Sequence, residues 1–235
     1  MIAIPRVSFR LAHTGRAMAA AAGVALLLVG GCSALKPEAS PTPPTYFTLD
    51  GKVEAGAGAA PGATRSPRKT RYTLIVTPPQ AAAGFDSPRI IYMRQPYKLE
   101  YFAHNEWVDP PARMISPQMV AAIEATSAFH AVVSAPGSSG GDMRLDTEVL
   151  VLQQEFGASP SKVRFALRAA LSEEGTRRVI ATRDFEAVQP ALSDDPYGGV
   201  QAANAVVRSV LASLAAFCAD NAVAWQPASR PVPAR

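Results

Sequence analysis

The sequence predicts an α+β fold, in which an antiparallel or mixed sheet carries two helices packed on one face. Apolar residues occupy every second position from Val163 to Leu171, and Lys162, Arg164 and Arg168 lie on the other face, the period-two pattern of a strand with one buried face. Residues 195–218 instead place apolar side chains at helical spacing for about 25 residues. Such a helix measures about 37 Å at ~1.5 Å per residue, long enough to cover one face of a sheet.

Shorter segments supply the other strands and the second helix. Strands are expected at residues 46–49, 72–76, 129–134, 145–153 and 178–188, with a hairpin of residues 89–94 and 97–104 around Gln95-Pro96. Ser116-Pro117 predicts the start of a short helix that ends near Ala128, because proline fits the first helical position. Asp194-Asp195 before Pro196 predicts a capped helix start rather than a catalytic pair of carboxylates.

The first 31 residues have the organisation of a bacterial lipoprotein signal peptide. A leader with three arginines precedes an apolar run at residues 18–29, which is shorter than the roughly 20 residues of a membrane-spanning helix. The run ends in Leu28-Val29-Gly30-Gly31-Cys32, which resembles a lipobox. We therefore expect removal of residues 1–31 and attachment of lipid, palmitate included, at Cys32. A plain secretory signal and an uncleaved anchor are the alternatives.

Composition divides the remaining chain into a tether, one domain and a tail. Residues 32–45 hold four prolines and little apolar content, so we expect an extended tether. Residues 46–225 are expected to form a single α+β domain with a flexible Gly/Ala-rich, basic loop at residues 51–70. Residues 226–235 are again rich in proline and are expected to form a disordered tail.

Charge and cysteine content exclude some classes of function. Without the leader, 20 basic residues face 19 acidic ones, a net charge of +1, so the pI of 9.3 gives no support for nucleic-acid binding. Cys218 has no intrachain partner if Cys32 carries lipid. Its place in an apolar helical pattern predicts a buried small side chain rather than a reactive thiol.

The sequence shows no set of residues suited to catalysis or metal binding. His104 and His130 have no second ligand at metal spacing, and the Ser/Gly-rich residues 138–141 lack the lysine of a phosphate-binding loop. No Gly-x-Ser-x-Gly nucleophile motif occurs. We therefore expect a protein that is not an enzyme and that needs no metal or cofactor.

Residues 89–132 carry the most distinctive pattern in the chain. Trp107 precedes Pro110 and Pro111, so it is either packed beneath the next helix or exposed as an anchor for a partner. Tyr101 and Arg94 are the other candidate partner contacts. In its order of residues this segment resembles the ABC-type transport auxiliary lipoprotein family, which includes the PqiC-like proteins. The matching residues are Arg89, Tyr92, Arg94, Leu99, Tyr101, Trp107, Pro110, Pro111, Met114, Phe129 and Val132, with Asn204 in the terminal helix.

The resemblance implies a non-enzymatic component of envelope transport. Family members work beside an ABC ATPase, a permease and a membrane-anchored MCE-domain protein to move lipids or other hydrophobic molecules between membranes. Ser33 stands where Asp would favour retention in the inner membrane, which implies an outer-membrane lipoprotein that faces the periplasm. The resemblance leaves open whether the protein forms a homo-oligomer. The alternative is a lipid or hydrophobic-ligand carrier that acts on its own, with a cavity between helix and sheet.

Overall fold

The computed structural model describes residues 43–50, 69–136 and 140–226. The signal peptide, Cys32, most of the tether, most of the loop expected at residues 51–70 and the tail from residue 227 lie outside the described residues. The expectations for those segments therefore stay predictions.

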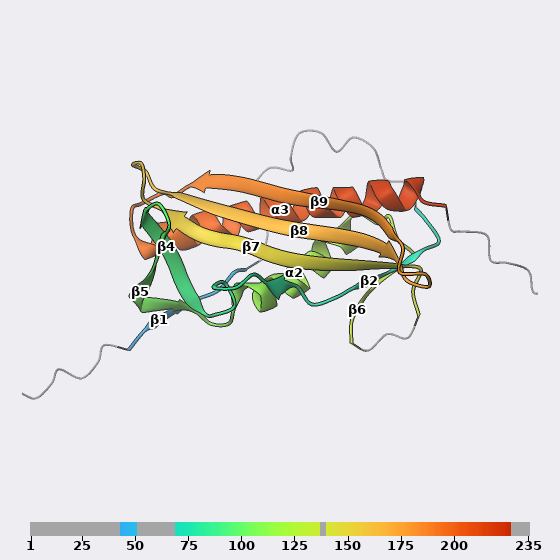
Figure 1. Cartoon of the computed structure of the whole chain (residues 1–235), viewed down its shortest axis with the longest axis horizontal. Coiled ribbons are helices and arrows are strands. Elements are labelled where there is room, and N and C mark those ends of the chain that lie inside the picture. Colours follow the sequence, from blue (N-terminus) through green and yellow to red (C-terminus); the bar gives the residue numbers. More distant parts are fainter. Residues whose placement is uncertain (1–42, 51–68, 137–139, 227–235) are drawn as a thin grey trace, which may run out of the picture. The chain divides into compact units, whose positions relative to one another are not determined.

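Within these described residues, nine strands form one mixed sheet around the long strand β7 (Met143–Glu155) (Figure 1). One edge of β7 pairs antiparallel with β8 (Lys162–Glu173), which pairs antiparallel with β9 (Val179–Pro190). The other edge of β7 is shared by three strands parallel to it: β2 (Thr73–Val76), β3 (Gln80–Ala81) and β4 (Arg89–Gln95). Beyond these lie β6 (Ala131–Ser134), next to β2, and β5 (Lys98–Trp107) with β1 (Thr45–Phe47), next to β4.

Two helices cover one face of this sheet, as the sequence predicted (Figure 1). Helix α3 (Pro196–Ala224) packs against β8 and β9, while α2 (Pro111–Ala125) packs against α3, β6 and β7. The predicted α+β class with a mixed sheet is therefore confirmed. By length and composition α3 could cross a membrane, but 61 % of its apolar window is buried, which is typical of a core helix.

Strand β8 shows why the sheet has one dry and one wet face. Its alternate residues Val163, Phe165 and Leu167 are buried in the core beneath the helices. On the opposite face, the Arg168 guanidinium lies 2.9 Å from the Asp184 carboxylate of β9. This contact holds the pKa of Asp184 below its usual range, since the charged hydrogen bond favours the ionised carboxylate.

Helix α2 begins earlier than the sequence predicted. Ser116-Pro117 was expected to start it, but the helix starts at Pro111 and Pro117 lies inside it. Pro111 is suited to the first helical position because no intrahelical hydrogen bond is lost there. Pro117 cannot donate a hydrogen bond to the carbonyl of Arg113, and both residues lie on the exposed side of the helix.

Helix α3 begins where the sequence predicted, at a cap formed by Asp195. The Asp195 carboxylate accepts a 2.7 Å hydrogen bond from the backbone N–H of Gly198, which lowers the pKa of this carboxyl. Its neighbour Asp194 accepts a 2.6 Å bond from the backbone N–H of Ser161. The two aspartates therefore fix the junction between β9 and α3, which agrees with capping rather than catalysis.

Cys218 lies on the buried face of α3 and is expected to resist alkylation in the folded protein. Its side chain is fully buried, and burial raises the pKa of the thiol to about 12. In a Cys32→Ser background, iodoacetamide at about pH 8 should label Cys218 about a thousandfold more slowly than in denaturant, because the thiolate is the reacting form. Equal labelling rates in the folded and denatured protein would contradict this expectation.

Candidate functional site

The β4–β5 hairpin presents an exposed aromatic and basic tip, which we define as residues 94–101. Pro96 and Tyr97 form its two-residue turn, since Gln95 pairs with Lys98. Tyr97 has φ +68° and a side chain 103 % exposed, so this aromatic ring contributes no burial to the fold. Non-glycine residues seldom adopt positive φ without a local reason.

The two faces of the hairpin tip differ in their contacts. On one face, the Arg94 guanidinium lies 5.0 Å from the centre of the Tyr92 ring and is bridged to Glu100, which also lies 3.0 Å from the Lys98 ammonium. On the other face, Tyr101 is 39 % exposed, and the Arg89 guanidinium stands 4.9 Å from its ring centre. A guanidinium against an aromatic ring fixes the orientation of both groups.

A depression beside Tyr101 adds concave surface to this face. It has a volume of about 510 Å³ and is also lined by Asp86, Arg89 and Glu106. An exposed ring next to a hollow with charges of both signs can receive a side chain of another protein, as aromatic and arginine anchors do at interfaces.

The three residues expected to contact a partner are not gathered into one patch. Tyr101 pairs in register with Ile91, whereas Tyr92, the neighbour of Arg94, pairs with Glu100, so Tyr101 and Arg94 face opposite sides of the hairpin. Trp107 is only 3 % exposed and belongs to the hydrophobic core. Of the two interpretations of Trp107, the structure therefore has the packed one, not the exposed anchor.

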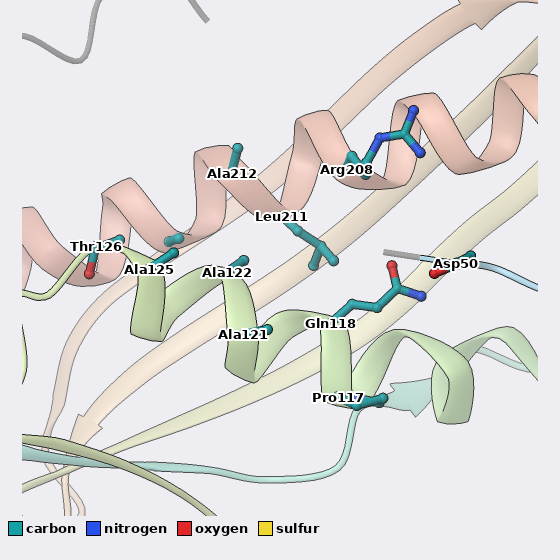
Figure 2. Close-up of a pocket in the computed structure, with 11 residues that line it drawn as sticks. Asp50, Pro117, Gln118, Ala121, Ala122, Ala125, Thr126, Arg208, Leu211 and Ala212 are labelled. Atoms are coloured by element: carbon teal, nitrogen blue, oxygen red, sulfur yellow. The ribbon is translucent and has the colours of Figure 1, made fainter. Parts of the chain in front are cut away.

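A second candidate site is an apolar groove between α2 and α3, with a volume of about 630 Å³ (Figure 2). Its walls carry small side chains at helical spacing, and Leu211 lies between the two helices. The wall alanines are Ala121, Ala122 and Ala125 from α2 and Ala212 and Ala215 from α3. Small side chains on both helices leave the space between them unfilled.

The carrier alternative predicted a ligand cavity between helix and sheet, and the space at that position is much smaller than the groove. There a void of about 10 Å³ is lined by Trp107, Leu152 and Gly199, which leaves no room for a ligand. A β carbon on Gly199 would collide with the buried side chain of Gln154, so α3 approaches the sheet very closely here. Among the described residues, the groove between the two helices therefore offers far more room for a hydrophobic ligand than this void beneath α3.

Polar side chains hold the chain between β1 and residue 50 at one end of the groove. Asn204 of α3 donates to the Thr48 carbonyl at 3.2 Å and accepts from the Asp50 N–H at 2.7 Å. Gln118 of α2 donates to the Leu49 carbonyl at 2.7 Å, and the Leu49 side chain is buried. These bonds join the segment that follows β1 to both helices.

Asn204→Ala is expected to lower the free energy of unfolding by about 1–2 kcal/mol, because the two hydrogen bonds that join it to the backbone of Thr48 and Asp50 are lost at ~0.5–1.5 kcal/mol each. Its third bond, to the Val200 carbonyl, lies within α3. Urea denaturation followed by tryptophan fluorescence measures this. Asn221→Ala is the matched control, since the Asn221 amide donates to Phe217 within the same helix. An equal loss of stability in both variants would show that the hydrogen bonds from Asn204 to residues 48 and 50 contribute no more to the free energy of unfolding than a bond within the helix.

A family model described as "ABC-type transport auxiliary lipoprotein component" matches residues 57–215, about two thirds of the chain and including the hairpin, α2 and most of α3. The chain belongs to this family. It is therefore an auxiliary lipoprotein of ABC-type transport, a membrane-anchored class of the cell envelope and not a known class of enzyme.

Solved structures support the fold of the auxiliary lipoprotein. A crystal structure of a Xanthomonas campestris protein is 23 % identical, covers 77 % of this chain and 97 % of its own, and has a TM-score of 0.67. A protein described only as uncharacterized is 16 % identical, covers 76 % of this chain and 98 % of its own, and has a TM-score of 0.54. No curated protein sequence matches the chain.

The groove was not predicted from the sequence of the auxiliary lipoprotein. Ala121 and Ala125, four residues apart, lie on one helical face, as do Arg208 and Ala212. Alanine is common in helices for reasons of propensity alone, so neither pair indicates a groove until the two helices are placed side by side. Among the described residues, no group of three His, Cys, Asp or Glu side chains is arranged to hold a metal ion.

Proposed function

We propose that this auxiliary lipoprotein is anchored in the outer membrane through Cys32, faces the periplasm, and docks an ABC/MCE-type system that moves lipids or other hydrophobic molecules between the membranes. Family membership, which rests on the match over residues 57–215, is the observation that carries the proposal. The lipobox ending in Cys32 and the serine at position 33 support the anchor and the choice of membrane.

The exposed hairpin tip is the surface we assign to the partner. Tyr97, Leu99 and Tyr101 are all exposed, so the tip presents two aromatic rings and one aliphatic side chain to a partner. Truncating an aromatic hot spot at an interface costs about 2 kcal/mol or more, which is at least about thirtyfold in affinity. A tip of this composition is suited to contact the MCE-domain protein or the permease.

Recovery of partners on a tagged protein tests this function. Tagged wild-type protein, isolated from detergent-solubilised envelopes, is expected to recover an MCE-domain protein together with the permease and ATPase, and Tyr101→Ala to reduce this recovery strongly. Tyr46→Ala is the matched control, because Tyr46 is also exposed but lies on β1. Absence of all these subunits from the wild-type sample would overturn the proposal.

The choice of membrane is tested separately by fractionation. Wild-type protein is expected in outer-membrane fractions of a density gradient, and Ser33→Asp should shift it toward the inner membrane. Wild-type protein found in inner-membrane fractions would contradict the assignment to the outer membrane.

One observation favours the second candidate, a carrier of a hydrophobic ligand that acts on its own. The groove between α2 and α3 is apolar and has the size of a small-molecule site, since such sites occupy about 300–1,000 Å³. A carrier would recover lipid, but no transport subunits, in the experiment with tagged protein.

A further inference from the structure

The groove between α2 and α3 has one charged end and one uncharged end. Arg208, Gln118 and Asp50 lie toward one end, and Ala125 and Thr126 toward the other (Figure 2). From residue 117 to residue 126 the α2 wall rises about 13 Å, at ~1.5 Å per residue. The groove is therefore elongated and changes from charged to uncharged along its length.

The exposed parts of the groove walls are unusual for helix surfaces in contact with water. Ala121, Ala125 and Ala212 are exposed, and no charged side chain lines the groove beyond Arg208 and Asp50 at the charged end. The outer surface of a helix in a globular protein is normally charged or polar. Leu211 and Ala215, both buried, complete the apolar lining.

Arg208 supplies the charge that distinguishes one type of ligand from another. Its side chain is half-buried, and it forms no ion pair with any carboxylate among the described residues, Asp50 included. The Gln118 amide, by contrast, is held by the carbonyls of Leu49 and Met114. A guanidinium is always charged and donates in a fork that matches a carboxylate.

We propose that this groove binds a free single-chain amphiphile with an anionic headgroup, its acyl chain along the alanine walls and its carboxylate on Arg208. The small side chains of the walls leave a groove wide enough for a methylene chain. The charged end of the groove matches the headgroup, and the alanine walls match the acyl chain. The site is formed by one chain of this protein and does not depend on the transport partners.

The test uses the full mature chain with Cys32→Ser, so that the protein carries no acyl chain of its own, and dodecanoate as the probe. Isothermal titration calorimetry is expected to show saturable binding of dodecanoate. Dodecyltrimethylammonium, with the same chain and the opposite charge, is expected to bind at least about tenfold more weakly, since the charged hydrogen bonds to Arg208 are absent. Equal binding of both probes would overturn the proposal.

Two groove variants with matched controls locate the site. Ala125→Trp fills the groove and Arg208→Gln removes its charge, and each is expected to weaken dodecanoate binding by about tenfold or more. Ser213→Trp, at an exposed α3 position outside the groove, and Arg183→Gln, on β9, are expected to leave binding unchanged. Circular dichroism and thermal unfolding of all four variants confirm that each is folded.

Other occupants of the groove would give different results, and each would overturn the proposal. Dodecanoate binding that survives both groove variants would place the amphiphile elsewhere on the protein. A dimer in native mass spectrometry that Ala125→Trp converts to a monomer, without saturable dodecanoate binding in the wild type, would make the groove a contact between copies. Because no transport subunit is present, these outcomes leave the docking function to be judged by its own experiment.

Discussion

Cys32→Ser is expected to move the protein from the membrane fraction to the soluble periplasm, or to stall its processing with the signal peptide attached. Serine lacks the thiol that receives the lipid, and each buried methylene of an acyl chain contributes about 0.8 kcal/mol to membrane binding. Several acyl chains together give stable attachment, so their loss should remove nearly all of the protein from membranes. Fractionation with immunoblotting, together with the intact mass, measures both outcomes.

The second cysteine provides the control for this experiment. Cys218→Ala removes a thiol that is buried in α3 and is expected to leave membrane attachment unchanged. A Cys32→Ser protein that is processed normally and stays with membranes would overturn the assignment of the anchor.

Phe165→Ala is expected to give the largest loss of stability among single substitutions of the sheet, about 3–5 kcal/mol. Phe165 is fully buried in β8, between Leu152 of β7 and Ala187 of β9 in the register. Alanine would leave a cavity that the three paired strands cannot readily close. Urea denaturation of the soluble Cys32→Ser form measures the change in the free energy of unfolding.

Val188→Ala is the control for the same sheet, because Val188 lies on β9 and is 48 % exposed. Its substitution should change the free energy of unfolding by about 0.5 kcal/mol or less. If both variants lost the same stability, the arrangement of buried and exposed faces described for β8 and β9 would be wrong.

The long elements could be predicted from the sequence because each repeats one simple pattern many times. Strand β8 places a buried apolar residue at every second position from Val163 to Leu171, and α3 combines an Asp195 cap with apolar residues at helical spacing. Each pattern depends only on the local geometry of a strand or a helix, so it can be recognised in the sequence without knowing which elements pack against it. The class of fold follows from them.

The start of α2 was predicted wrongly because two prolines competed for the same position. Ser116-Pro117 has a capping serine and a proline, the typical pattern of a helix start, whereas Pro111 offers the proline without a capping side chain before it. The choice depends on burial: Ala112 and Ile115 are buried in the core, so the helix extends back to include them. Strand β3, only two residues long, is too short for any period to reveal.

The candidate sites were predicted only in part for a related reason. The hairpin of Arg94 and Tyr101 follows from alternation and a Pro-containing turn, but the sequence does not show which residues share a face across its irregular register. The groove depends on how α2 and α3 lie beside each other, which is a property of tertiary packing. Trp107 could be placed in the core only once β1 was seen to pair with β5.

The entry of the chain into the domain has a mechanical consequence. Strand β1 lies parallel to the end of β5, and the residues that follow it are held by Asn204 and Gln118. Tension on the residues before Thr45 would pull β1 along its own axis, so its hydrogen bonds to β5 would be loaded together in shear. Force from a membrane anchor would therefore reach α2 and α3 directly, while the long β7–β8–β9 ladder bears little of it.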